Sequence, residues 1–354
     1  MAKFERVKFD PATWEREWST FADRHVFQSA GWISFLAEDL KAEPVLAALK
    51  EDDKILGYFT GLIIRKFGMK ILGSPFRGWS TAYMGFNLHP GVSRRTAAEA
   101  LPRFAFRELG CIHFEVTDMF MTEADLDGLG FSQVRHPTLE VDLTRSEEDM
   151  FNNFTKSCRW TVRKAEKNGV VIEEAADARF AEDYSSQLDE VFAKQSMMAY
   201  FGVDRVRVLM KHLQPAGNLL LLRARDPQGN CIATALFPAT HEFSFYWGGA
   251  SLRSGQKLYP NELLQWHAIR YWKSRGMKVY NMIGNKEFKQ KFGGRETFVP
   301  MFYQSRFKLL GQLRTKAIPI AKAALKLAYR VKTLGRTKPV ASETPAAPPD
   351  SEQS

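Results

Sequence analysis

The chain has 354 residues, of which 45% are hydrophobic and 25% charged, and its formal net charge is +10. This composition is typical of a soluble globular protein with two domains, and no apolar run approaches the ~18 residues that span a bilayer, so we expect neither a signal peptide nor a transmembrane helix. Cys111, Cys158 and Cys231 are odd in number and widely separated. They exclude a disulfide framework and a cysteine metal site, which favours a reducing, cytoplasmic setting with no bound metal.

Positive charge is concentrated near the C-terminus. Residues 301–340 contain ten lysines and arginines and no acid, and residues 311–338 have the spacing of a basic amphipathic helix. Such a helix suits a polyanionic partner, either RNA such as tRNA or an anionic membrane surface, while a solvated helix face explains the same pattern. Residues 339–354 have the composition of a disordered tail.

The first part of the chain predicts a helical start and then a sheet. Residues 10–40 carry apolar side chains at helical spacing. Hydrophobic alternation and turn residues then predict strands, together with one helix that Pro102 interrupts or kinks. The expected elements are strands at 44–50, 55–66 and 69–76, an aromatic loop at 79–86, a helix at 93–110, a strand at 111–118, a short helix and turn at 122–131 and a strand at 138–143.

The second part repeats this order after a helical stretch at residues 146–200. The expected elements are strands at 218–226, 231–240 and 243–249, a helix at 260–275, a strand at 277–283, a short segment at 287–292 and a strand at 297–304. We therefore predict an α/β (α+β) protein with two tandem domains, 1–145 and 146–300, each a mixed, mostly antiparallel sheet flanked by helices. A strand at 301–310 is expected to return to the first domain.

Residues 243–292 carry the strongest chemical signal. A strand ends in two glycines, a loop leads into a helix that begins at Pro260, and a second strand follows. Loop amides and a helix N-terminus favour an anion, and this unit resembles the one in which acyl-CoA transferases of the GNAT superfamily hold their donor. An ordinary βαβ crossover without a ligand explains it equally well. The candidate donor-binding residues are Trp247, Gly248, Arg253, Gly255, Tyr259 and Asn261.

Four segments together resemble the FemAB-type transferases, the two-domain branch of the GNAT fold. They are VFQSAGW (Val26–Trp32), TKSCRWTVRKAEKNGV (Thr155–Val170), the stretch from Leu258 to Gly284, and EFKQKFGG (Glu287–Gly294). The resemblance implies two tandem GNAT-like domains plus the basic C-terminal helix. It also implies N-acyl transfer from an acyl-CoA or an aminoacyl-tRNA, neither of them a resident cofactor. The acceptor would be a small-molecule or lipid-linked amine of a cell-envelope, polysaccharide or lipid precursor, met in the cytoplasm or at the inner membrane surface.

The resemblance also assigns residues to the site. Lys289, which follows Phe288, matches a lysine credited with stabilising the oxyanion, although a surface lysine in a basic loop is the plain alternative. Arg159 and Arg163 share a helix face and can clamp a phosphate or carboxylate, unless the helix is simply solvated. The further substrate-binding candidates are Lys156, Lys164, Phe288, Trp79 and Tyr83, and the candidate general base is Asp118, at the end of its strand.

A second class of function stays open. The positions after Trp32 lack the lysine that FemAB-type enzymes often use on lipid-linked precursors, which argues against a lipid-linked muropeptide acceptor. Leu258 stands where a second small residue would let the backbone approach a pyrophosphate. This second departure motivates the alternative of a catalytically inactive FemAB-like protein that binds RNA or an anionic envelope precursor. A measurement of turnover would distinguish an active transferase from this inactive binding protein. His113, His241 and His267 are scattered, and we interpret each as structural.

Overall fold

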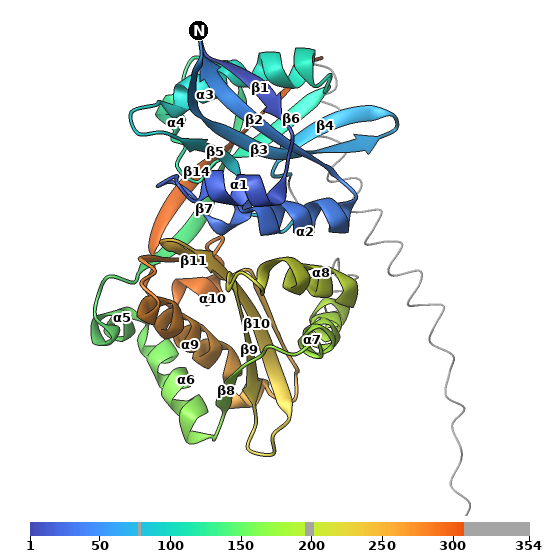
Figure 1. The fold of residues 1–354 in the computed structure, drawn as a ribbon. Helices are drawn as coiled ribbons and strands as arrows, with labels where there is room; N and C mark the ends of the chain where they lie inside the picture. The colour runs from blue at the N-terminus through green and yellow to red at the C-terminus, as the bar shows by residue number, and fades with distance from the viewer. Residues whose placement is uncertain (77–78, 195–201, 308–354) are drawn as a thin grey trace, which may run out of the picture.

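The structure is a computed structural model that describes residues 1–76, 79–194 and 202–307. The predicted helix 311–338 and tail 339–354 lie outside the described residues, as does part of the predicted segment 301–310. Figure 1 shows two halves, one above the other, each with helices packed on a sheet. Within the described ranges, no helix is long and apolar enough to cross a bilayer.

The N-terminal half follows the predicted order, with two additional short strands. Asp10 and Ser29 accept hydrogen bonds from the first turns of α1 and α2, which fixes where these helices begin. The elements are β1 Lys3–Val7, α1 Pro11–Trp18, η1 Val26–Gln28, α2 Ala30–Leu40, β2 Glu43–Glu51, β3 Lys54–Lys66, β4 Met69–Ser74, β5 Gly85–Leu88, α3 Arg94–Arg103, η2 Phe104–Glu108, β6 His113–Thr117 and α4 Glu123–Leu126.

The C-terminal half differs from prediction where strands are short. β8 interrupts the expected helical stretch 146–200, and the expected strand 243–249 is broken at Tyr246 and Trp247. The elements are α5 Glu147–Asn153, α6 Lys156–Lys167, β8 Val171–Glu174, α7 Phe180–Lys194, α8 Val203–Leu213, β9 Leu219–Arg225, β10 Cys231–Thr240, β11 Phe243–Phe245, β12 Gly248–Ser251, η3 Gln256–Leu258, α9 Pro260–Ser274, β13 Val279–Asn281 and α10 Glu287–Gln290.

Two long strands, β7 (Ser132–Asp142) and β14 (Arg295–Ser305), run through both halves. The main path of the sheet is β1-β2-β3-β4-β6-β14-β7-β13-β11-β10-β9-β8, so the two expected sheets are joined in one mixed, mostly antiparallel sheet. β14 pairs with β6 over Met301–Ser305 and with β7 over most of its length, while β13 pairs with the end of β7. These two strands therefore fix one half against the other.

The segment Val26–Trp32, which carries part of the resemblance, lies at the junction of the halves. Phe27 packs on Phe245 of β11 with ring centroids 4.6 Å apart. The Gln28 side chain donates to the carbonyl oxygens of Met84 and Phe86, at 2.9 and 3.1 Å. This motif thus has a structural role, because it ties the aromatic loop and the second half to α2.

A second contact between the halves joins α8 to α2 (Figure 1). Arg205 of α8 is 8% exposed and forms an ion pair with Asp39 of α2, and its guanidinium also donates to the Trp79 carbonyl oxygen at 2.7 Å. A buried charge that is both paired and hydrogen-bonded is costly to separate, so this contact resists opening of the halves.

Candidate active site

A pocket of about 470 Å³ opens between the two halves. Its walls come from the aromatic loop after β4, from β7, from the break between β11 and β12, and from the turn after β13. The residues that matter for its chemistry are Phe76, Tyr83, His136, Trp247, Ile283 and Gly284. The pocket combines apolar walls with a few polar groups, which is the usual make-up of a small-molecule site.

Two parallel strands separate at this pocket. β11 and β13 pair as far as Phe245 and Asn281, and the Tyr246 N–H still donates to the Asn281 carbonyl oxygen at 2.9 Å. Trp247 then turns away to pair with Leu236 of β10, at 3.1 Å. The break that shortens the predicted strand is therefore the feature that opens a gap between the two strand ends.

The turn after β13 is held in an unusual conformation. Ile283 and Gly284 have positive φ angles of 51° and 100°. The Ile283 N–H donates to the Asn281 side-chain oxygen at 2.9 Å, and the Gly284 N–H donates to Thr138 Oγ1 at 3.2 Å. A non-glycine residue in this backbone region is uncommon, and here buried side chains of β7 and β13 fix it.

Lys289 completes the turn from the other side. Its Nζ donates to the Met282 and Ile283 carbonyl oxygens, and it lies 5.4 Å from the centre of the Tyr246 ring. A Cβ atom on Gly284, which lines the pocket, would be 3.9 Å from this nitrogen. Burial, and to a lesser degree the neighbouring Lys286, lowers the pKa of Lys289 to about 8. The lysine is therefore placed beside the pocket and not on an open surface loop.

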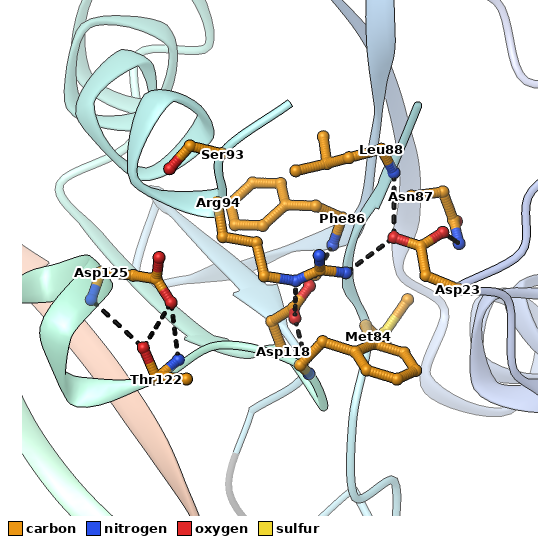
Figure 2. A network of polar contacts seen from close by, with 12 residues as sticks. Asp23, Met84, Phe86, Asn87, Leu88, Ser93, Arg94, Asp118, Thr122 and Asp125 are labelled. Carbon is orange, nitrogen blue, oxygen red and sulfur yellow. Dashed lines mark hydrogen bonds and ion pairs between the residues drawn. The ribbon is translucent and has the colours of Figure 1, made fainter. Parts of the chain in front are cut away.

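Asp118, the predicted general base, is not among the residues that line the pocket. Its side chain is 1% exposed. One oxygen accepts from Arg94 Nε at 2.8 Å and from the Phe120 N–H at 2.9 Å, and the other accepts from the Phe86 N–H at 2.7 Å. Figure 2 shows Arg94 between Asp118 and Asp23.

Burial raises the pKa of the Asp118 carboxyl, while Arg94 opposes this shift. Because Arg94 and two backbone amides already bind the carboxylate, it serves as a structural anchor for β5 and α3. Gly85 shows how tight the arrangement is, because a Cβ atom there would lie 2.5 Å from the carboxylate. These contacts occupy the carboxylate and favour a structural role for it.

His136 lines the pocket and was missed by the sequence reasoning. Side chains alternate along a strand, so His136 shares a face of β7 with Thr138, which contacts the turn after β13. The expected strand began at residue 138, after Pro137, and this left the histidine in a loop. Pairing of β7 with β14 extends the strand back to Ser132.

The two aromatic-loop candidates occupy different positions. Tyr83 lines the pocket, and burial raises its pKa to about 12, so its hydroxyl is neutral at physiological pH. The Asn281 side chain donates to this hydroxyl at 3.5 Å. Trp79 lies behind the wall, where its ring packs edge-on against Phe76 at 4.8 Å. It supports the pocket but is not one of its lining residues.

The predicted donor loop is packed against the sheet. The Arg253 N–H donates to Glu190 Oε1 at 2.9 Å, and the N–H groups of Gly255 and Tyr259 donate to carbonyls within the loop. A Cβ atom on Gly255 would lie 2.6 Å from Cβ of Ile232. Many of the amides that would cradle a pyrophosphate are therefore already paired, although Trp247 at the start of this region does line the pocket.

Gly248 and Asn261 have packing roles in the same region. A Cβ atom on Gly248 would approach the Tyr184 hydroxyl to 2.7 Å, so a larger residue does not fit there. Asn261 Nδ2 donates to Ser251 Oγ at 3.2 Å and so joins the first turn of α9 to β12. Both residues shape the donor region without facing the pocket.

The predicted arginine clamp on α6 is not assembled. Arg159 is used at the end of α5, where it donates to the Phe154 carbonyl oxygen and, at 2.7 Å, to that of Asn152. Arg163 lies over the ring of Phe151 at 5.3 Å. Lys156 is exposed and Lys164 half-buried. Phe288, the remaining candidate, packs on Phe292 with ring centroids 5.4 Å apart.

The sequence reasoning also missed Trp160, on the exposed side of α6. Its side chain is 54% exposed, although tryptophan is usually buried. Its ring meets Tyr259, the residue before α9, edge-on at 5.4 Å. This contact places an open aromatic surface and the basic helix next to the loop predicted to bind the donor.

Comparison with known proteins finds a family model that part of the second half resembles. Residues 152–290 match the model of the acetyltransferase (GNAT) domain. No curated protein matches the chain significantly. The solved structures described next are similar to this chain in fold but distant in sequence.

A crystal structure of FemX has 14% identity, covers 87% of this chain and 99% of its own, and has a TM-score of 0.69. The C-terminal domain of a putative lysylphosphatidylglycerol synthetase from Agrobacterium fabrum has 11% identity, covers 74% and 85%, and has a TM-score of 0.51. A tandem GNAT protein from the clavulanic acid biosynthesis pathway has 10% identity, covers 86% and 98%, and also has a TM-score of 0.51.

Proposed function

We propose that this protein, a GNAT-type acyltransferase with the two-domain FemAB-type fold, forms an amide at the pocket between its halves. The acceptor amine would attack the carbonyl carbon of an activated acyl group. The bond to the leaving group, a thiolate or a ribose oxygen, would then break, and the amine would lose one proton. The observation that carries this proposal is Lys289, a half-buried cation beside the gap between β11 and β13.

In this reaction Lys289 would stabilise the oxyanion of the tetrahedral intermediate. An ammonium group has three N–H donors, and the carbonyl oxygens of Met282 and Ile283 take two of them. The third can point toward the pocket. A lysine with a pKa of about 8 is mostly protonated at pH 7, and a cation in a partly desolvated site interacts strongly with developing negative charge.

His136 would receive the proton of the amine, directly or through water. Imidazole is the side chain best suited to proton transfer near neutral pH, and His136 lies on the pocket wall. We do not assign this role to Asp118, because Arg94 and backbone amides hold its carboxylate. The proton acceptor and the oxyanion partner would thus come from β7 and from α10, on different sides of the pocket.

The donor would be an acyl-CoA or an aminoacyl-tRNA, and both end in an adenosine nucleotide. Because the loop amides near Arg253 and Gly255 are paired, a pyrophosphate held only by that loop is disfavoured. Trp160 offers a stacking surface instead, with Lys156 and Arg163 on the same helix to meet phosphates. We infer that Trp160 and Tyr259 contact the adenosine end of the donor.

The acceptor would be an amine of a cell-envelope, polysaccharide or lipid precursor. The name of the lysylphosphatidylglycerol synthetase domain with this fold refers to a lipid product, which motivates lipid-linked amines in a substrate screen. The pocket volume of about 470 Å³ suits one sugar or a head group. The alternative, an inactive protein that binds RNA or an anionic precursor, predicts binding without turnover.

The test begins with the donor. The full chain is titrated with acetyl-CoA, longer acyl-CoAs, and charged and uncharged tRNA at two salt concentrations. The donor that binds is then incubated with amino sugars and amine-bearing lipids, and amide products are measured by mass spectrometry. Saturable donor binding with amide formation supports the proposal. Binding that falls steeply with salt, shows no preference for charged tRNA and yields no product would indicate the inactive binding protein.

A further inference from the structure

The hairpin between β3 and β4 extends beyond its neighbours in the sheet. Lys66 pairs with Met69 across the turn. The register with β2 ends where Glu43 faces Ile63, and the register with β6 begins where Ile71 faces His113. Residues 64–70 therefore form a tip that pairs only with itself among the described strands, and Figure 1 shows this hairpin reaching out from the N-terminal half.

Large apolar side chains lie at this tip. Phe67 is 97% exposed and Met69 is 38% exposed. Phe67 and Gly68 form the turn with positive φ angles of 51° and 76°. Asparagine and glycine are the usual residues in such turns, and an aromatic residue there is rare. Because Phe67 is almost fully exposed, packing against the residues that the structure describes does not explain its presence.

Cations surround the tip. Lys66 is exposed, Lys70 donates to the Leu109 carbonyl oxygen at 3.1 Å, and Arg65 lies 3.6 Å from Glu43. Glu43 is the acid that faces this group, and it also pairs with Arg6. The tip thus combines a protruding aromatic side chain with three cationic side chains. Glu43 neutralises their charge only in part.

A second segment ends at the same edge of the sheet. The Ile112 N–H donates to the Lys70 carbonyl oxygen at 2.9 Å, and the Arg306 N–H donates to the Ile112 carbonyl oxygen at 2.9 Å. Phe307, the last residue described, is 54% exposed. The sequence that continues from this point contains no acid until Glu343. The basic C-terminal segment therefore starts beside the hairpin tip.

We propose that residues 64–70, together with Arg306 and Phe307, form a docking surface for an anionic lipid membrane. Phe67 inserts its ring among the acyl chains near the head groups, and the flanking lysines and arginines meet the lipid phosphates. A protruding tip favours a membrane over a nucleic acid, because single strands bind in grooves and Met69 offers no ring for stacking. This inference does not depend on the proposed acyl transfer.

The test is co-sedimentation of the full chain with vesicles of phosphatidylcholine alone and of phosphatidylcholine mixed with phosphatidylglycerol. The wild-type chain should bind the anionic vesicles. Phe67→Ser should weaken this binding roughly tenfold, because it removes one buried aromatic side chain. Lys66→Glu should weaken it as well, and more strongly at low salt. The matched control is Val171→Ser, because Val171 is 61% exposed on β8 in the other half and should not matter.

Several outcomes would overturn the proposal. One is a wild-type chain that ignores anionic vesicles. Another is a Phe67→Ser variant that binds them as the wild type does, which would leave residues 311–338 as the sole anchor. Loss of tRNA affinity or of self-association in Phe67→Ser, with vesicle binding intact, would assign the tip to RNA or to a second copy of the chain. The melting temperature of each variant verifies that the fold is unchanged.

Discussion

Replacement of Lys289 separates catalysis from stability. We expect Lys289→Met to lower kcat by roughly 100- to 1,000-fold, as removal of one oxyanion donor does in other enzymes. The variant should not lose stability at pH 7. The folded chain lowers the pKa of Lys289 from 10.5 to about 8, and at 1.36 kcal/mol per pKa unit the charged form costs about 3 kcal/mol. This cost offsets the two hydrogen bonds that the variant loses.

The sign of the pH effect follows from the same shift. Between pH ~8 and ~10 the unfolded chain holds a proton on Lys289 that the folded chain has released, so the stability of the wild type rises with pH relative to Lys289→Met. Denaturant melts of both proteins at pH 7 and at pH 10 measure this difference. Activity should move in the opposite direction and decline above pH ~8, because the oxyanion needs the protonated lysine.

Lys286→Met is the matched control for this experiment. Lys286 is exposed, and its charge helps to lower the pKa of Lys289. Its replacement should preserve kcat near pH 7 and move the alkaline decline to higher pH. The assay is release of the coenzyme A thiol or discharge of aminoacyl-tRNA, according to the donor that binds. A Lys289→Met variant that keeps more than a tenth of the wild-type kcat would refute the oxyanion role.

Three further variants test other parts of the site and the fold. His136→Gln should lower kcat by roughly 100-fold or more with a small change in KM. Partial rescue of kcat by added imidazole would distinguish proton transfer from a packing defect. Trp160→Ala should weaken donor binding by roughly tenfold, while Trp160→Phe should keep much of the affinity, and calorimetry can measure both. An equal loss of donor affinity in the two variants would argue against stacking. Asp177→Asn should lower the melting temperature at pH 7 but converge with the wild type as pH falls from ~4 toward 2. Arg223 lowers the pKa of Asp177 to about 2, and the stability from this pair is lost on protonation.

Local patterns in the sequence predicted most elements. Lys289 was assigned only because the segment Glu287–Gly294 resembles FemAB-type transferases, and its Nζ lies close to Gly284 of the pocket lining. Asp118 shows where such reasoning stops. Its location at a strand end was predicted correctly, but its role depends on Arg94 and Asp23, which are distant in sequence and meet only in the fold (Figure 2).

Pairing between distant strands explains the other misses. The expected strand began at Thr138, so His136 was not considered, and Pro137 between them cannot donate to a ladder. In the fold β14 pairs with β7 past this point and brings the histidine to the pocket wall. Arg159 and Arg163 do share a helix, but Arg159 donates to carbonyl oxygens at the end of α5, while Arg163 is exposed and lies over the Phe151 ring. Helical spacing alone could not reveal those partners.

The two ends of β4 set a distance between two surfaces. Met69 lies at the hairpin tip, and Pro75 and Phe76 at the other end of the strand belong to the pocket. At about 3.3 Å per residue, roughly 20 Å separates them. With the tip in a bilayer and β4 along the bilayer normal, the pocket would stand that far above the lipid phosphates, beyond the reach of a phosphatidylethanolamine amine. An acceptor bound to lipid would then need several sugars or an extended peptide between its anchor and its amine.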